Sequence, residues 1–351
     1  MAGQTISTAS GKLYLTSTSN PLTITSTGSV TTTASGDAID APSGTAWQIN
    51  NAGTISGVIG TSSAGIYSPA SGIAVQNTGK IYGATAGIWL SDGGDVTNSA
   101  IGLITATGNY GVYIGGGPGV VTNAGTITGG WYAVDFATSS SANLLTVDPG
   151  AMFNGAVNGN GGVLELTAGS GSIGLIGSSA FSGFETLSDD GSALWTLTGA
   201  NTIADVTDNG GLTIAGSLDV SAAVGAASTG QFDLQTGSSL EVAADTAAHS
   251  QVDFLGASQL TIDNAALFGT GVGGSSYAGP LLENFAAGDT IDLHGFMTAA
   301  AALLYNPANG LLQITNGASQ LATVDFQNST LGTGSFSFAS DGNGGTLIKH
   351  S

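Results

Sequence analysis

The sequence has no cysteine and no arginine, three lysines, seven prolines and no long apolar run. Without cysteine the fold cannot rely on disulfides, and a cysteine-ligated metal site is excluded. Without a run of about 18 apolar residues a transmembrane helix is excluded, so we expect no membrane insertion. Ion pairing is excluded as a general source of stability, because 23 acidic residues face three lysines.

The charge balance restricts the partners that the surface can attract. The formal net charge is −20, and the cations are Lys12, Lys80 and Lys349. Such a surface repels nucleic acid, anionic lipid and acidic polysaccharides, and none of these is an expected partner. We expect no cofactor, with calcium as the one ion that many carboxylates could attract.

The composition favours strands and turns over helices. Glycine accounts for 58 of 351 residues, hydrophobic residues for 41% and charged residues for 7%. The hydrophobic content is too high for a disordered chain. Because Lys, Arg and Glu are scarce while Thr, Ser, Val, Ile and Gly abound, we expect short strands joined by tight turns.

An internal repeat runs through the first part of the chain. A Gly-x-(Ile/Val) motif recurs at steps of 25, 26, 23 and 23 residues, at Gly28, Gly53, Gly79, Gly102 and Gly125. From the second copy on, an asparagine precedes it, at Asn51, Asn77, Asn98 and Asn123. Each unit of about 24 residues holds three short apolar segments, which predicts one coil of three strands. Since one unit cannot bury its apolar face alone, the coils must stack into an all-β, parallel β-solenoid, or β-helix.

The recurring Asn–Gly pair has a structural interpretation. Asparagine tolerates left-handed backbone and bonds to nearby backbone groups, while glycine permits a positive φ. We therefore predict turn glycines at Gly53, Gly79, Gly102 and Gly125. We also predict that the four repeat asparagines stack in one column as a hydrogen-bonded ladder. The alternative is a row of asparagines that contacts glycans.

The period changes further along the chain. Leu212, Phe232 and Val252 are 20 residues apart, and so are Val220, Leu240 and Leu260. This spacing predicts a continued solenoid with a different coil shape. We divide the chain into a first solenoid at 1–155, a second solenoid at 156–275, and a β-rich cap, or secretion or assembly module, at 276–351. Within the cap, 297–306 is either a short helix or a strand edge.

Few side chains are candidates for catalysis or metal binding. Asp189 and Asp190 form the best carboxylate pair, but neighbours on a strand point to opposite faces, so we predict no catalysis there. The histidines His249, His294 and His350 lack the spacing of a zinc site. Short acidic turns are the candidate calcium ligands, at Asp92, Asp95, Asp189, Asp190 and Asp341.

Aromatic side chains cluster in the strands of successive repeats. Trp89, Tyr113, Trp131 and Tyr132 form this cluster. Aromatic stacking inside a solenoid, or over its edge, is the position that we predict. If the rings face outward instead, they form a stripe suited to contact with a sugar or a protein partner.

The repeats "VTNAGTITGG", "AGIWLSDGG" and "NAGTISG" resemble the passenger repeats of bacterial autotransporter and filamentous-haemagglutinin-like surface proteins. The later segments "WTLTGANTIADVT" and "GPLLENFAAGDTIDLHGF" resemble the carboxy-terminal part of large alphaproteobacterial β-solenoid proteins. The resemblance implies a right-handed solenoid, secretion, and a role in adhesion or a surface matrix. No membrane β-barrel follows the repeats and no signal-peptide pattern precedes them, so we expect export to the bacterial surface or medium without a cleaved leader.

The function expected from these features is that of a secreted, non-enzymatic structural protein. Its open first strands, in "GQTISTASGKLYLTSTSNPLTITS", suggest end-to-end self-assembly into filaments at a surface or in an extracellular matrix. An adhesin or glycan-binding module is the first alternative, with surface glycans as partners. A polysaccharide-cleaving enzyme is the second.

Overall fold

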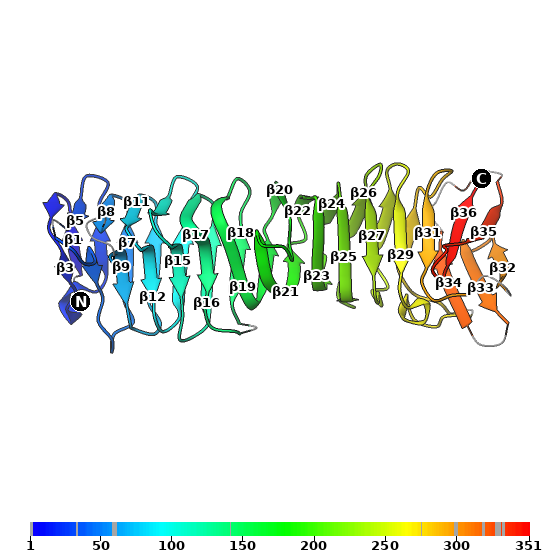
Figure 1. Cartoon of the computed structure of the whole chain (residues 1–351), viewed down its shortest axis with the longest axis horizontal. Coiled ribbons are helices and arrows are strands. Elements are labelled where there is room, and N and C mark those ends of the chain that lie inside the picture. Colours follow the sequence, from blue (N-terminus) through cyan, green and yellow to red (C-terminus); the bar gives the residue numbers. More distant parts are fainter. Residues whose placement is uncertain are drawn as a thin grey trace. The chain divides into compact units, whose positions relative to one another are not determined.

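A computed structural model describes residues 3–32, 34–57, 62–140, 142–274, 276–297, 301–317, 320–326, 331 and 334–351. The chain is all-β, with 56% strand and 2% helix, and its parallel stacked coils form a β-solenoid of about 11 turns, as predicted (Figure 1). It divides into two compact units. Unit 1 comprises Met1–Glu165 and Ser179–Glu185, and unit 2 comprises Leu166–Ser178 and Thr186–Ser351.

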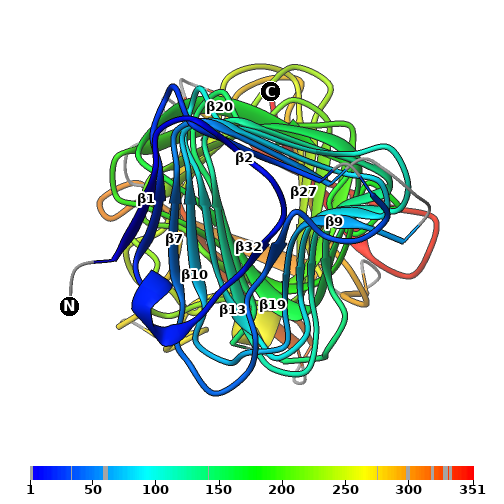
Figure 2. The same ribbon diagram turned by 90° about the vertical axis from the view of Figure 1, so that its left-hand side faces the viewer.

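The coils of unit 1 have three sides, and each side is a column of parallel strands. The first column contains β1 (Gln4–Ile6), β4 (Leu22–Ile24), β7 (Gln48–Asn51), β10 (Ala74–Asn77), β13 (Gly94–Asn98), β16 (Gly119–Asn123) and β18 (Leu144–Val147). The second contains β2 (Ala9–Ser10), β5 (Ser29–Thr31), β8 (Thr54–Gly57), β11 (Lys80–Gly83), β14 (Leu103–Ala106) and the first parts of β17 (Thr126–Phe136) and β19 (Met152–Leu166). The third contains β3 (Leu13–Tyr14), β6 (Ile39–Asp40), β9 (Ala64–Ser68), β12 (Ala86–Leu90), β15 (Tyr110–Ile114) and later parts of β17 and β19. Figure 2 shows β7, β10 and β13 of the first column side by side.

The core of unit 1 is a set of stacked aliphatic residues, one from each strand of a column. In the second column Ile55, Ile81, Ile104 and Ile127 pair in register, and all are fully buried. This follows from the two-residue period of a strand, because every second side chain faces inward. Each buried isoleucine contributes roughly 1.5–3 kcal/mol relative to an exposed one, so the repeat also stabilises the stack of coils.

Unit 2 keeps two full columns of parallel strands. One contains β20 (Gly169–Gly174), β22 (Ala193–Thr198), β24 (Gly211–Ile214), β26 (Gln231–Leu234), β28 (Gln251–Phe254) and β30 (Leu281–Glu283). The other contains the first parts of β23 (Ala200–Thr207) and β25 (Ser217–Val224), then β27 (Ser239–Val242), β29 (Gln259–Ile262) and β31 (Thr290–Leu293). The third side begins with the end of β21 (Phe181–Asp189) and the last residues of β23 and β25, which pair through Leu187, Val206 and Val224. It is then reduced to the bridges Val224–Asp245 and Asp245–Phe268. The predicted coil of three strands is thus present in unit 1. The coils of unit 2 are shorter because their third side is reduced.

The 20-residue register holds in one column of unit 2 and fails in the other. Leu212, Phe232 and Val252 pair in register as the period predicts. Leu240 and Leu260 also pair, but Leu240 lies beside Leu218 rather than the predicted Val220. The coil between them is therefore two residues longer, and the apolar i, i+2 pattern concealed this shift.

Antiparallel strands replace the parallel columns beyond β31. β32 (Ala301–Asn306), β33 (Leu311–Asn316) and β34 (Gln320–Asp325) form a meander that meets β30 at Leu281. β35 (Phe336–Ser340) and β36 (Thr346–His350) form a hairpin, and β36 pairs with β31. Of the segment predicted as helix or strand, 301–306 is a strand and 298–300 lie outside the described residues.

Helix is confined to two 3₁₀ turns within the described residues. These are η1 (Ser17–Ser19) and η2 (Ala265–Leu267). In the part of the chain that the structure describes, no helix has the length and apolar character needed to cross a membrane.

Candidate functional site

The four repeat asparagines lie in one column, at the ends of β7, β10, β13 and β16. Their side chains form a ladder in which each Nδ2 donates to the Oδ1 of the next: Asn51 to Asn77 at 2.8 Å, Asn77 to Asn98 at 2.8 Å, and Asn98 to Asn123 at 2.9 Å. All four are at most 2% exposed. The predicted ladder is present, and its burial excludes these side chains from contact with an external glycan.

The glycines beside the ladder have a different role from the one predicted. None of Gly53, Gly79, Gly102 and Gly125 has a positive φ, and neither do the ladder asparagines. Instead, a Cβ at Gly79 would lie 2.2 Å from the carbonyl oxygen of Gly53 in the preceding coil. The expectation of a left-handed turn is therefore wrong. Glycine is required because consecutive coils approach too closely here for any side chain.

An outward-facing aromatic row runs along the third column of unit 1. Tyr67, Trp89 and Tyr113 pair in register, one from each of β9, β12 and β15. Ile88 and Leu90 on either side of Trp89 are fully buried, so the alternation of the strand turns the indole outward. We predicted a position inside the solenoid or over its edge for Trp89 and Tyr113; the inward position is wrong, because aliphatic residues fill the inner positions.

Further rings widen this row into what we call the aromatic face. Tyr113 and Trp89 have ring centroids 4.4 Å apart, and Tyr110 packs edge-on against Trp89 at 5.8 Å. Tyr132 stacks on Tyr110 at 6.2 Å with an interplanar angle of 9°, and Trp131 is 64% exposed. Such contacts hold the rings in fixed orientations, each pair contributing roughly 0.5–1.5 kcal/mol. The face is therefore an ordered surface.

A surface depression of about 510 Å³ adjoins the aromatic face. It is lined by Asp37, Ser62, Ser63, Ala64, Tyr67, Ala84, Thr85, Trp89, Gly108 and Asn109. Burial raises the pKa of Asp37, whose Oδ1 accepts a hydrogen bond from the Ala64 N–H at 2.6 Å. Asp40 lies nearby and pairs with Lys12 at 2.6 Å. Aromatic rings, hydroxyls, an amide and a carboxyl thus converge on one concave surface.

Unit 2 contains a buried pair of carboxyl groups that involves one of the predicted residues. Asp189 is 4% exposed and interacts electrostatically with Asp208, which is fully buried. Asp189 Oδ1 also accepts from the Asn209 N–H at 2.7 Å. Burial, and then the charge of Asp189, raises the pKa of Asp208 to about 9. Both carboxyls are thus buried away from the surface.

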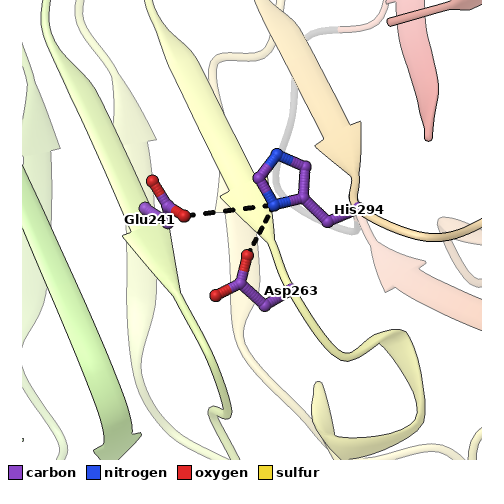
Figure 3. Close-up of side chains that lie close together, drawn as sticks. All are labelled: Glu241, Asp263 and His294. Atoms are coloured by element: carbon purple, nitrogen blue, oxygen red, sulfur yellow. Dashed lines mark hydrogen bonds and ion pairs between the residues drawn. The ribbon is translucent and has the colours of Figure 1, made fainter. Parts of the chain in front are cut away.

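A second group of ionisable side chains surrounds His294, immediately after β31. Its Nδ1 lies 2.7 Å from Asp263 Oδ1 and 4.0 Å from Glu241 Oε1, and these side chains converge on the imidazole (Figure 3). Its Nε2 lies 3.9 Å from Asp292 Oδ2. Burial lowers the pKa of His294, but the surrounding carboxylates outweigh this and raise it. Asp341 joins this group, and it accepts backbone N–H bonds from Asn343 and Gly345.

The acidic turns proposed as calcium ligands have different surroundings. Within the described residues, two groups of three potential metal ligands lie within 4.8 Å of one another: Glu241, Asp263 and His294, and Asp292, His294 and Asp341. Of the predicted acids, Asp341 belongs to one of them. Asp92, Asp95, Asp189 and Asp190 belong to neither group.

Sequence spacing did not identify the His294 group because its members come from different coils. Glu241 and Asp292 occupy one outward row, two strands apart, with Thr261 between them. Asp263 lies two residues after Thr261, and His294 lies two residues after Asp292. The row continues the 20-residue period, but the coil between Thr261 and Asp292 is longer, and this insertion concealed the alignment.

Comparison with models of known protein families finds no match, and comparison with curated proteins finds none either. The solenoid architecture is thus shown by the structure itself. The resemblance to autotransporter-passenger and filamentous-haemagglutinin-like proteins stays a prediction.

Proposed function

We propose that this chain is a secreted, non-enzymatic β-solenoid that binds a neutral polysaccharide along the aromatic face of unit 1. One observation carries this proposal: Tyr67, Trp89 and Tyr113 present one outward ring per coil, in register. Sequential coils are spaced by roughly 4.8 Å. The ring array is therefore periodic and linear, which suits a periodic, linear ligand.

The chemistry of the face fits sugar rings. Aromatic side chains offer large apolar planes with little conformational freedom to lose, and pyranose rings have apolar C–H faces that can stack on them. Thr85 and Asn109 in the adjoining depression supply hydroxyl and amide groups for hydrogen bonds to sugar hydroxyls. Aromatic planes would supply affinity, and the polar groups would set the orientation of the ligand.

Charge restricts the class of polysaccharide. The net charge of −20 and the carboxyls of Asp37 and Asp40 beside the rings oppose an anionic chain. A neutral glycan meets no such penalty, and we therefore favour neutral polysaccharides.

Binding without cleavage is favoured by the positions of the nearest carboxyls. Asp37 Oδ1 accepts a hydrogen bond from the Ala64 N–H at 2.6 Å, and Asp40 pairs with Lys12 at 2.6 Å. Glycoside hydrolysis uses two carboxyl groups about 5–9.5 Å apart that flank the substrate. Both carboxyls here are instead held by partners within the protein.

Affinity electrophoresis of the full chain through gels containing neutral glucans, xylans or mannans tests the proposal. We expect retardation by at least one of these and none by polygalacturonate, with Trp89→Ala weakening the affinity at least tenfold, about 1.4 kcal/mol. Tyr82→Ala is the matched control, since Tyr82 is a half-buried outer residue on the second column of the same unit. Equal migration of wild type and Trp89→Ala in every gel would refute the proposal.

End-to-end assembly is a second candidate, supported by the first coil. Among the described residues, each strand of the first coil pairs along one edge only: β1 with β4, β2 with β5, and β3 with β6. Their other edges offer backbone groups to a second copy. Light scattering across a concentration series should then show growing particles, whereas a constant monomer mass would remove this candidate.

A further inference from the structure

We propose that His294, Asp292 and Asp341 of unit 2 bind a divalent transition metal, with zinc as the best fit, and that Asp263 orients the histidine. This site is distinct from the aromatic face. The three ligand side chains offer atoms that lie within 4.8 Å of one another.

The two nitrogens of His294 have different surroundings. Nδ1 lies 2.7 Å from Asp263 Oδ1, within hydrogen-bonding distance. Donation of the Nδ1 proton to this carboxylate leaves the Nε2 lone pair directed at Asp292. Histidines that bind metals commonly donate their second N–H to a carboxylate in this way.

The distance between His294 and Asp292 suits an intervening ion. Nε2 and Asp292 Oδ2 are 3.9 Å apart, which is too long for a hydrogen bond. Two ligands of a tetrahedral zinc with bonds of about 2 Å lie about 3.3 Å apart. A side-chain shift of about 0.6 Å would therefore bring both atoms to bonding distance of one ion.

Asp292 supplies independent support for a cation. The residue is 6% exposed, and its Oδ1 is buried without a hydrogen-bond partner among the described residues. A buried carboxylate without a partner is costly, and a metal ion supplies the missing charge. Asp341 brings a second carboxylate, held by the N–H groups of Asn343 and Gly345.

The donor set selects the metal. One imidazole nitrogen and two carboxylates match zinc, or manganese, better than calcium, which takes six to eight oxygen ligands.

The site also has a structural consequence. Asp292 and His294 lie in and just after β31, whereas Asp341 lies in the turn between β35 and β36. The metal would therefore fasten the terminal hairpin to the last parallel strand.

Titration calorimetry and thermal unfolding of the chelator-treated full chain test the proposal, with Zn²⁺, Mn²⁺ and Ca²⁺ as separate probes. We expect one Zn²⁺ per chain, a higher melting temperature with Zn²⁺, and a much smaller response to Ca²⁺. Asp341→Asn and His294→Gln should lose the Zn²⁺ response, and Asp263→Asn should weaken affinity about 10–100-fold. His249→Gln is the control and should behave as wild type.

Asp292→Asn keeps the proposal testable if other variants fold poorly. It removes the buried charge, so the metal-free chain should melt at a higher temperature than wild type while the Zn²⁺ response disappears. Absence of Zn²⁺ binding by wild type, an equal Zn²⁺ response in Asp292→Asn, or preferential binding of Ca²⁺ would each overturn the assignment.

Discussion

Asn77 Nδ2 donates a hydrogen bond to Asn98 Oδ1 at 2.8 Å, although the turn after Asn98 is two residues longer than the turn after Asn77. The extra length is accommodated outside the coil, where Ile101 is 81% exposed. The strands on either side keep their register. The ladder is therefore maintained across an insertion, which indicates that its hydrogen bonds help to align the coils.

Removing one member of the ladder should be costly. Asn77→Ala leaves the buried Nδ2 of Asn51 and the buried Oδ1 of Asn98 without a ladder partner, and we expect a loss of about 2–4 kcal/mol. Urea unfolding measures this loss. Asn154→Ala is the control, because Asn154 is exposed and bonds through its side chain to Thr128, and it should cost less than about 0.5 kcal/mol. Similar unfolding midpoints for both variants would contradict a stabilising ladder.

The requirement for glycine beside the ladder can also be tested by measuring stability. Gly79→Ala places a Cβ 2.2 Å from the Gly53 carbonyl oxygen, so the coils must separate locally. We expect a loss of about 2 kcal/mol or more, as for other overpacked sites. Gly11→Ala is the matched control, since a Cβ there meets nothing within 4 Å and φ is not positive. It should be neutral or slightly stabilising, because alanine restricts the unfolded chain. Equal effects of the two substitutions on thermal unfolding would show that close approach is not the constraint.

The stacking of coils was predictable because it depends on one-dimensional spacing. The repeat of Asn51, Asn77, Asn98 and Asn123 fixes which strands lie beside one another, whatever fills the turns. Inward and outward positions then follow from the two-residue period of a strand. Hydrophobicity alone left Trp89 either inside the solenoid, over its edge or outward, whereas its neighbours Ile88 and Leu90 occupy the inner positions and leave the outward one for the indole.

Sites that combine several coils were less accessible to sequence analysis. His294 meets Glu241, Asp263, Asp292 and Asp341 across the strands of unit 2, and coils of unequal length hide that register. The constraint on Gly79 was misassigned for a related reason. A close approach between coils depends on the three-dimensional path of two chain segments, whereas a positive φ is a local property.

The terminal hairpin should protect the last parallel strand from association. Ile348 of β36 is fully buried and pairs with Ile291 of β31. Ile348→Asp should detach the hairpin and expose the edge of β31, so we expect oligomers in size-exclusion chromatography. Lys349→Asp is the control, since Lys349 is the exposed neighbour on the same strand. A monomeric elution profile for both variants would show that the hairpin is not needed to cover this edge.

The Asp189–Asp208 pair should make stability depend on pH in a defined direction. The folded-state pKa of Asp208 is about 9, above that of an unfolded aspartate. The folded chain therefore holds a proton that the unfolded chain has lost between about pH 4 and pH 9. Stability from this group is fully present below about pH 4 and falls as the pH rises toward 9.

Replacing the protonated carboxyl with an amide should remove this dependence. Asp208→Asn keeps the size of the side chain and an N–H donor toward Asp189, but it carries no proton to lose. We expect little change in the urea midpoint at pH 4.5 and a gain of about 1–3 kcal/mol at pH 8.5. Asp205→Asn, an exposed acid on β23, should leave the pH profile of the wild type unchanged. If Asp208→Asn instead destabilised the chain equally at both pH values, Asp208 would be ionised in the folded state, with its charge compensated by another group.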